Sequence, residues 1–296
     1  MANLKDLRNR ISSVKSTQKI TSAMKMVAAA KLRRAQERVE SARPYAEKMQ
    51  RIISSIADNV TSPEIFPPIL MGREKDNTHL IIVASSDRGL CGGFNTNIIK
   101  AAKELMNNLE NKGKKVKFLC VGKKGKEQIT RFYKDKMINV ETDFSQAKID
   151  FSEISDFTKK ITEMFDKEEF DSCTFIYAKF RSAIQQNIIK QKLIPFTRVD
   201  SQEKESVTDK EKEVYDFEPQ EGEILPSLIP ANITTQIFHG LLENYASEQG
   251  ARMTAMDSAT RNASDMIDDL TLFYNRTRQA VITKELIEII SGAEAV

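Results

Sequence analysis

The first stretch of the chain has an amphipathic helical pattern. Its apolar residues recur every three or four positions, first as Leu4, Leu7, Ile11 and Val14 and then as Ile20, Ala23, Val27 and Ala30. Pro44 lies inside the pattern, but the periodicity resumes after it, so we expect a bend there rather than an end. The proline- and glycine-containing cluster TSPEIFPPILMG closes the pattern. The spacing predicts a helical segment over residues 1–58.

The last stretch of the chain repeats this kind of pattern without a proline. Its seam positions alternate steps of three and four, as Ala246, Gln249, Met253, Met256, Thr260, Ala263, Ile267, Leu270, Tyr274, Thr277 and Val281. A run of this length predicts a coiled-coil helix over residues 231–296. Because the seam is rich in small and polar residues, we expect the partner helix to approach closely.

Between these helices the pattern changes its period. The strand-like runs THLIIVASS, VKFLCVG and SCTFIYAKF alternate with the helical runs NIIKAAKELMNNLENKG, KKGKEQITRFY and ISDFTKKITEMFDKEEF. This alternation predicts a Rossmann-like α/β domain with a mainly parallel sheet over residues 76–198. The run QNIIKQKLIPF would add an edge strand, because its proline suits that position. The charged residues 199–230 predict a loop or linker.

The order of these parts predicts an α/β fold class with a long antiparallel coiled coil. The two terminal helices each need a partner for their apolar stripe, and the central domain brings the chain back. Charge favours the same pairing, because residues 1–43 carry eleven basic and three acidic residues, whereas residues 243–296 carry five basic and nine acidic ones. The remaining positive charge is expected to face nucleic acid, anionic lipid or a carboxylate-rich protein.

Composition narrows the chemistry. With 296 residues, 40% of them hydrophobic and 29% charged, the chain has the composition of an ordered soluble protein. Its apolar runs stop at strand length, well short of the roughly 18 residues of a membrane span. Cys91, Cys120 and Cys173 form no CxxC pair and are expected to be reduced and buried, and His79 and His239 are too few for a zinc site or a Ser/His/Asp triad. We therefore expect no metal, no cofactor and no catalytic residue.

The loop SSDRGLCGGFNTN lies between a predicted strand and a predicted helix, where a dinucleotide-binding turn would lie. Its glycines Gly89, Gly92 and Gly93 have the spacing GxxGG rather than GxGxxG, which favours a structural turn or a partner contact. The basic first helix lacks the aromatic residues and the dimeric layout of DNA-binding helices, so we expect no nucleic acid partner. A coiled-coil scaffold and a nucleotide-binding α/β module remain as alternatives.

Three segments resemble the γ subunit of the rotary proton-translocating ATP synthase. They are STQKITSAMKMVAAAKLRRAQ, SSDRGLCGGFN and the terminal block that runs from ENYASEQGARM to SGAEAV. The resemblance implies a non-catalytic central rotor shaft, which couples rotation of the c ring to conformational cycling of three catalytic β subunits for ATP synthesis. It implies three α and three β subunits, an ε subunit and the c ring as partners. It also implies peripheral membrane association through the c ring alone, on the cytoplasmic face of the bacterial inner membrane rather than the mitochondrial matrix face.

The resemblance also assigns contacts to residues of this chain. It implies β-subunit contacts at Met24, Lys25, Arg252, Arg278, Gln279 and Thr283, and contacts with the ε subunit and c ring at Asp87, Arg88, Gly89, Tyr215 and Glu218. It further implies that Met24 lies beside Arg252, so that facing positions sum to about 276 and Leu4 faces Leu272. On that register the last two dozen residues extend past the N-terminus as a single helix of roughly 35 Å.

Overall fold

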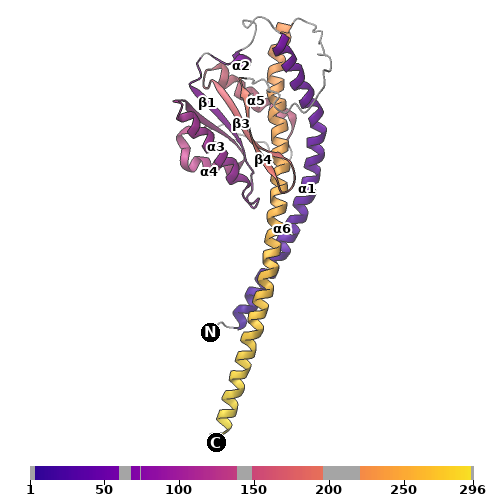
Figure 1. The fold of residues 1–296 in the computed structure, drawn as a ribbon, viewed down its shortest axis with the longest axis vertical. Coiled ribbons are helices and arrows are strands. Elements are labelled where there is room, and N and C mark those ends of the chain that lie inside the picture. Colours follow the sequence, from indigo (N-terminus) through magenta and orange to yellow (C-terminus); the bar gives the residue numbers. More distant parts are fainter. Residues whose placement is uncertain (1–3, 60–67, 74, 139–148, 196–220, 295–296) are drawn as a thin grey trace. The chain divides into compact units, whose positions relative to one another are not determined.

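The structure is a computed structural model that describes residues 4–59, 68–73, 75–138, 149–195 and 221–294. The chain divides into two compact units, of which unit 1 consists of Met1–Ala30 with Arg252–Val296 and unit 2 consists of Lys31–Ala251. Helix α1 (Leu4–Asn59) and helix α6 (Glu221–Glu294) each contribute to both units (Figure 1).

Unit 2 contains a four-stranded sheet with the strand order β2-β1-β3-β4 (Figure 1). Its strands are β1 (Thr78–Ala84), β2 (Lys115–Val121), β3 (Ser172–Phe180) and β4 (Gln186–Ile194). Strand β1 pairs in parallel with β2 and β3, and β4 pairs antiparallel with β3 at one edge. The mainly parallel sheet and the edge position of its fourth strand confirm the sequence prediction.

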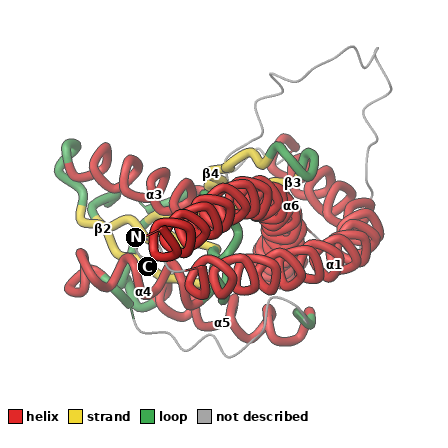
Figure 2. Tube along the Cα trace, turned by 90° about the horizontal axis from the view of Figure 1, so that it is seen from below, coloured by secondary structure: helices red, strands yellow, loops and turns green. Residues whose placement is uncertain are grey.

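Helices cover both faces of this sheet (Figure 2). One face packs on α3 (Phe94–Glu110) and α4 (Lys123–Tyr133), whereas the other packs on α5 (Phe151–Asp166) and on the unit 2 parts of α1 and α6. Alternate residues of β1 enter the two cores, and Leu80 to Ala84 are all fully buried. A continuous apolar run is expected for a strand that is covered on both faces. The short helices α2 (Pro68–Met71) and η2 (Lys134–Lys136) complete the described elements of unit 2.

The unit 2 part of α6 is hydrogen-bonded to strand β3. Asn244 Oδ1 accepts a hydrogen bond from the backbone N–H of Ala178 at 3.2 Å, and Ser247 donates to the carbonyl of the same residue at 2.9 Å. Glu243 Oε2 accepts from the backbone N–H of Phe180 at 2.8 Å. These bonds satisfy Asn244 Oδ1, the Ser247 hydroxyl and one carboxylate oxygen of Glu243, which the helix buries between the sheet and its other neighbours.

Helix α6 begins at Glu221, before the predicted start at residue 231. It therefore includes Pro230, which the sequence analysis placed in a loop. Ile229, Ile233 and Ile237 of this segment lie in the hydrophobic core beside the sheet. Their burial compensates for the helical hydrogen bond that a proline removes. Helix α1 likewise continues through Pro44 as predicted, with Val39 before it and Met49 after it both buried.

Candidate functional surfaces

Unit 1 is a pair of antiparallel helices with a narrow seam (Figure 1). On α1 the buried seam positions include Leu7, Thr21 and Ala28. On α6 they include Met256 and Ala263. The later seam positions Ile267, Leu270, Tyr274, Thr277 and Val281 are half-buried, while their neighbours along the helix are mostly exposed. This alternation confirms the predicted spacing of the α6 seam.

Two hydrogen bonds and one ion pair fix the register of the two helices. Arg8 Nη2 donates to the Tyr274 hydroxyl at 2.9 Å, and the Thr260 hydroxyl donates to the Thr21 hydroxyl oxygen at 2.9 Å. Lys25 Nζ lies 2.5 Å from Asp257 Oδ1. Facing positions therefore sum to 281 or 282.

This register corrects the sequence-based pairing, in which facing positions summed to about 276. The Thr21–Thr260 pair determines the register, because two short side chains can hydrogen-bond only where the backbones lie side by side. Met24 consequently lies nearly level with Asp257, and Arg252 lies about 8 Å farther along the helix axis. Leu4 likewise faces the region of Arg278 rather than Leu272, whose side chain is 63% exposed.

A small charge network surrounds this level of the coiled coil. Asp257 pairs with Lys25 on α1 and also with Arg261, one turn further along α6. Hydrogen bonds from the two cations lower the pKa of the Asp257 carboxyl below its usual value. At the other end of the seam, the hydrogen bond from the Arg8 guanidinium lowers the pKa of Tyr274. These bonds therefore join the two helices at two separate levels of the seam.

The six residues implied as β-subunit contacts lie at two levels of unit 1. Met24 and Arg252 are half-buried near one end, beside the exposed Lys25. Arg278, Gln279 and Thr283 are exposed on α6 near the other end. About 20 helical residues, or roughly 30 Å, separate the two levels. The structure therefore does not bring the six together into one site.

Helix α1 carries a second apolar stripe, which we call the outer stripe and define as Ile20, Ala23, Val27 and Ala30. The sequence analysis assigned these residues to the seam, and the structure contradicts this, because Ile20 is 60% and Val27 is 54% exposed. Gln18, Thr21 and Ala28 lie toward the seam instead. Both series have helical spacing, and hydrophobicity alone selected the wrong one. At this level of α1 the smaller and more polar series meets α6, and the larger aliphatic side chains face outward.

The C-terminal end of α6 is the second exposed apolar surface of unit 1. Figure 1 shows α6 extending past the first residues of α1. We call its exposed apolar residues the tip and define them as Ile282, Leu286, Ile287, Ile289 and Ile290. Each of them is at least 44% exposed. An apolar surface of this kind is typical of a region that contacts another protein.

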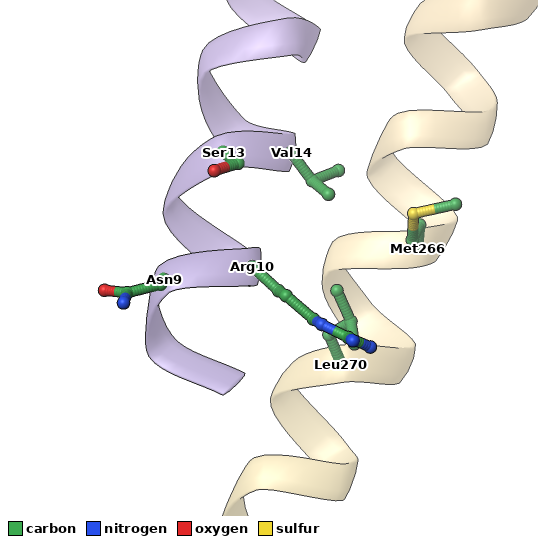
Figure 3. A pocket seen from close by; sticks show the side chains of 6 residues that line it. All are labelled: Asn9, Arg10, Ser13, Val14, Met266 and Leu270. Carbon is green, nitrogen blue, oxygen red and sulfur yellow. The ribbon is translucent and has the colours of Figure 1, made fainter. Parts of the chain in front are cut away.

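A shallow groove of about 330 Å³ lies between the two helices of unit 1 (Figure 3). Its lining consists of Asn9, Arg10, Ser13, Val14, Met266 and Leu270. In Figure 3 the Arg10 side chain crosses the groove toward the α6 helix at Leu270. The lining combines apolar residues, namely Val14, Met266 and Leu270, with polar ones. The two helices therefore cover their apolar seam residues only partly at this level.

In unit 2 the glycine loop between β1 and α3 is held by its own side chains. Asn95 Nδ2 donates to Ser86 Oγ at 2.7 Å, and Ser86 Oγ donates to the carbonyl of Arg88 at 2.6 Å. Asp87 Oδ1 accepts from the backbone N–H of Lys123 at 3.2 Å. The loop thereby places the exposed Arg88 between the half-buried Asp87 and Gly89. Tyr215 and Glu218, the other two residues implied for this surface, lie outside the described residues.

Potential metal ligands form no cluster in the described residues. Nowhere in the described ranges do three or more His, Cys, Asp or Glu side chains gather closely enough for a metal ion. The three cysteines are buried and form no disulfide, as predicted, and burial raises the pKa of Cys120 to about 12. Among the described helices none is both long and apolar enough to cross a membrane.

Comparison with known proteins gives a consistent picture. The family model described as ATP synthase matches residues 3–296. A protein of Rhodospirillum rubrum named ATP synthase gamma chain is 54% identical over 299 residues, and the alignment covers all of both chains. A chain in the Tetrahymena thermophila mitochondrial ATP synthase central stalk and c-ring structure is 25% identical, with a TM-score of 0.57, over 81% of this chain and 99% of that one.

A second solved structure matches the fold over a larger part of the chain. A chain of the Euglena gracilis mitochondrial ATP synthase, in an OSCP/F1/c-ring assembly, has a TM-score of 0.67 and covers 99% of this chain and 94% of that one. Its sequence identity is 19%, so this match supports a conclusion about the fold alone. The arrangement of long terminal helices around a mostly parallel sheet is therefore shared.

Proposed function

The chain belongs to the ATP synthase gamma chain family, and on that premise we propose that it is the central stalk rotor of an ATP synthase. Its coiled coil would stand in the cavity formed by three α and three β subunits, and its α/β unit would meet the ε subunit and the c ring. The full-length relatives and the central stalk structure support this role. The chain itself would perform no bond chemistry, because ATP would form on the β subunits.

The observation that carries the proposal is the exposure of two apolar surfaces on unit 1. The outer stripe presents aliphatic side chains to solvent although α6 already packs against another face of α1, and the tip does so where α6 extends past α1. Each Å² of apolar surface that is removed from water contributes about 25 cal/mol. A surrounding sleeve of other subunits would bury both surfaces. An isolated coiled-coil scaffold would have no use for them outside its seam.

The coupling mechanism follows from the asymmetry of one two-helix shaft inside a ring of three equivalent sites. At any rotation angle the outer stripe can face only one direction, so the three β subunits meet different contacts. A shift of a two-state equilibrium from 1:99 to 99:1 needs about 5.5 kcal/mol of differential binding. Several contacts of ordinary strength supply that amount. Rotation would therefore change which β conformation is favoured at each site.

The implied β contacts suit two separate roles in this scheme. Met24, Lys25 and Arg252 lie near the Asp257 network, where exposed cations would meet acidic β-subunit loops. Arg278, Gln279 and Thr283 lie close to the tip. Their polar side chains would contact the α and β subunits that surround this end of the coiled coil. Two levels about 30 Å apart resist tilting of the shaft better than a single level. Torque would thus be transmitted without loss of alignment.

In the α/β unit, the glycine loop would serve as a rigid contact for the ε subunit and the c ring. The Asp87 side chain and the Arg88 carbonyl are held by hydrogen bonds, and Gly89 follows them directly, which reduces the entropy lost when a partner binds. Together with Tyr215 and Glu218, this loop would engage the ε subunit and the c ring. Membrane association would then be peripheral, through the c ring, at the cytoplasmic face of a bacterial inner membrane.

Co-purification tests this function directly. A tagged copy of the chain, recovered from the native membrane fraction, is expected to bring three α and three β subunits per chain, together with ATP hydrolysis activity. Native mass spectrometry gives the stoichiometry. Recovery of the chain as a homodimer would support the scaffold alternative. Saturable nucleotide binding to the chain by itself would support the nucleotide-binding module. Either result would overturn the proposal.

A further inference from the structure

A pocket of about 310 Å³ lies in unit 2, apart from the surfaces described above. Its lining comes from α1, α5 and α6 and consists of Ala42, Tyr45, Ala46, Phe151, Thr235, Phe238 and His239. The volume lies at the lower end of the range for small-molecule sites. The proposed rotor function uses none of these residues.

Aromatic rings form the walls of this pocket. Phe151 and Phe238 make an edge-to-face contact with their ring centroids 5.6 Å apart. Phe151 is 42% exposed and Tyr45 is 55% exposed, so two large rings border the opening. The methyl groups of Ala42 and Ala46 leave the space between the rings open. This shape suits a flat aromatic ligand, because offset and edge-to-face contacts stabilise such a ring.

The first polar group of the lining, Thr235, can only accept a hydrogen bond from a ligand. Its hydroxyl donates its single proton to the carbonyl of Ala231 at 2.8 Å. The oxygen lone pairs remain for an incoming donor.

The second polar group, His239, has the same character. Its Nε2 is buried without a hydrogen bond and lies 3.9 Å from Glu243 Oε1, which is also buried without one. Burial lowers the pKa of His239 below its usual value, and Arg43 acts in the same direction while Glu243 opposes it, so these surroundings favour the neutral ring. The facing carboxylate favours the tautomer with the proton on Nε2. Nδ1 is then an acceptor.

We propose that this pocket binds a small hydroxylated aromatic molecule. The ring system would lie between Tyr45, Phe151 and Phe238, and its hydroxyl would donate to the Thr235 oxygen or to His239 Nδ1. An aromatic carboxylate is expected to fit less well, because Thr235 and His239 present acceptors and the Glu243 carboxylate lies 3.9 Å from the imidazole. Arg43, 4.0 Å from the same Glu243 oxygen, offsets part of this negative charge, and the exposed Tyr45 hydroxyl can donate as well as accept. An unsubstituted aromatic would fill the space but would leave the acceptors without a partner.

Three probes that share one ring system test this proposal. They are 2-naphthol, naphthalene and 2-naphthoate, and their fluorescence can be followed in the full-length chain because it contains no tryptophan. Saturable binding of 2-naphthol is expected, about tenfold weaker binding of naphthalene, and still weaker binding of 2-naphthoate. Absence of saturable 2-naphthol binding, or equal affinity for the three probes, would overturn the proposal.

Substitutions locate the binding. Ala42→Leu fills the pocket and is expected to weaken 2-naphthol binding at least tenfold, whereas Ser41→Leu, at the exposed neighbouring position, should leave it unchanged. If Ala42→Leu alters the fold, as judged by circular dichroism, Tyr45→Ala removes an exposed wall instead and should also weaken binding. Equal effects of Ser41→Leu and the pocket variants would place the probe elsewhere and contradict the assignment.

Discussion

At the residue scale, Gly240 determines how closely α6 approaches the sheet. A Cβ atom at this position would lie 2.4 Å from Cε1 of Phe175, whose ring is fully buried. Gly240→Ala is therefore expected to lower the free energy of unfolding by about 1–3 kcal/mol through overpacking. Urea unfolding measures the change. Gly89→Ala is the matched control, since its Cβ would meet nothing within 4 Å, and equal losses in both variants would refute the packing argument.

His79 is expected to make the stability of unit 2 depend on pH. Its ring contacts the hydroxyls of Thr174 at 2.8 Å and Ser172 at 2.5 Å, and burial lowers its pKa to about 4, although Asp76 opposes the shift. The unfolded chain keeps the ordinary value near 6.5 and so binds more protons between pH 6.5 and 4. The contribution of His79 to the free energy of unfolding is therefore fully present above pH 6.5, and about 3 kcal/mol of it is lost as the pH approaches 4.

An NMR titration of the two imidazoles checks this value. The His79 signal is expected to remain that of the neutral ring down to about pH 5. His79→Asn, which cannot titrate, should lose less stability than the natural chain between pH 7 and pH 4.5, whatever its stability at pH 7. A His79 pKa near 6.5, or an unchanged pH profile in the variant, would show that the ring is not buried in this way.

At the element scale, the sequence predicts the strands and helices of unit 2 because each has a strong period and clear ends. Leu80 to Ala84 form an unbroken apolar run, and glycine follows α3 at Gly113. The start of α6 was predicted too late, because Pro230 is a helix breaker by local rules and only burial of its neighbours in the core shows why it is tolerated.

The sequence does not determine which face of α1 meets α6. Ile20 and Val27 are more hydrophobic than Gln18 and Thr21, yet the latter lie toward the seam. The usual rule selects the most apolar stripe for the partner helix, and it fails here because the more apolar stripe of α1 faces away from α6. The register is hidden for the same reason, since small seam residues at many positions allow several alignments. The candidate β contacts came from resemblance, and local patterns alone indicate none of them.

Engineered cysteines test the register of unit 1. Thr21→Cys with Thr260→Cys should form a disulfide under mild oxidation, because the two hydroxyl oxygens are 2.9 Å apart. The native cysteines are buried and should not interfere. Met24→Cys with Arg252→Cys, which follows the alternative register, should cross-link poorly. Counting free thiols by mass spectrometry distinguishes them, and efficient cross-linking of the second pair alone would contradict the register described above.

At the scale of the whole molecule, the outer stripe connects solubility with assembly. Ile20→Glu and Val27→Glu should reduce self-association of the isolated chain, since they remove exposed apolar surface. The same changes should weaken recovery of α and β subunits at least tenfold, because a buried carboxylate would lack a partner. Thr17→Glu, on an exposed polar position of the same helix, is the control. Improved solubility with undiminished assembly would mean that the stripe is not an interface.

If this chain turns inside its partners and so links their conformations, its rotation can be observed directly. The most direct measurement fixes the β subunits of the purified complex to a surface, attaches a probe to the α/β unit of the chain and adds ATP. Continuous rotation of the probe in one direction is expected, with three equivalent pauses for each revolution. ATP hydrolysis at an undiminished rate while a demonstrably attached probe stays still, or moves only randomly, would contradict it.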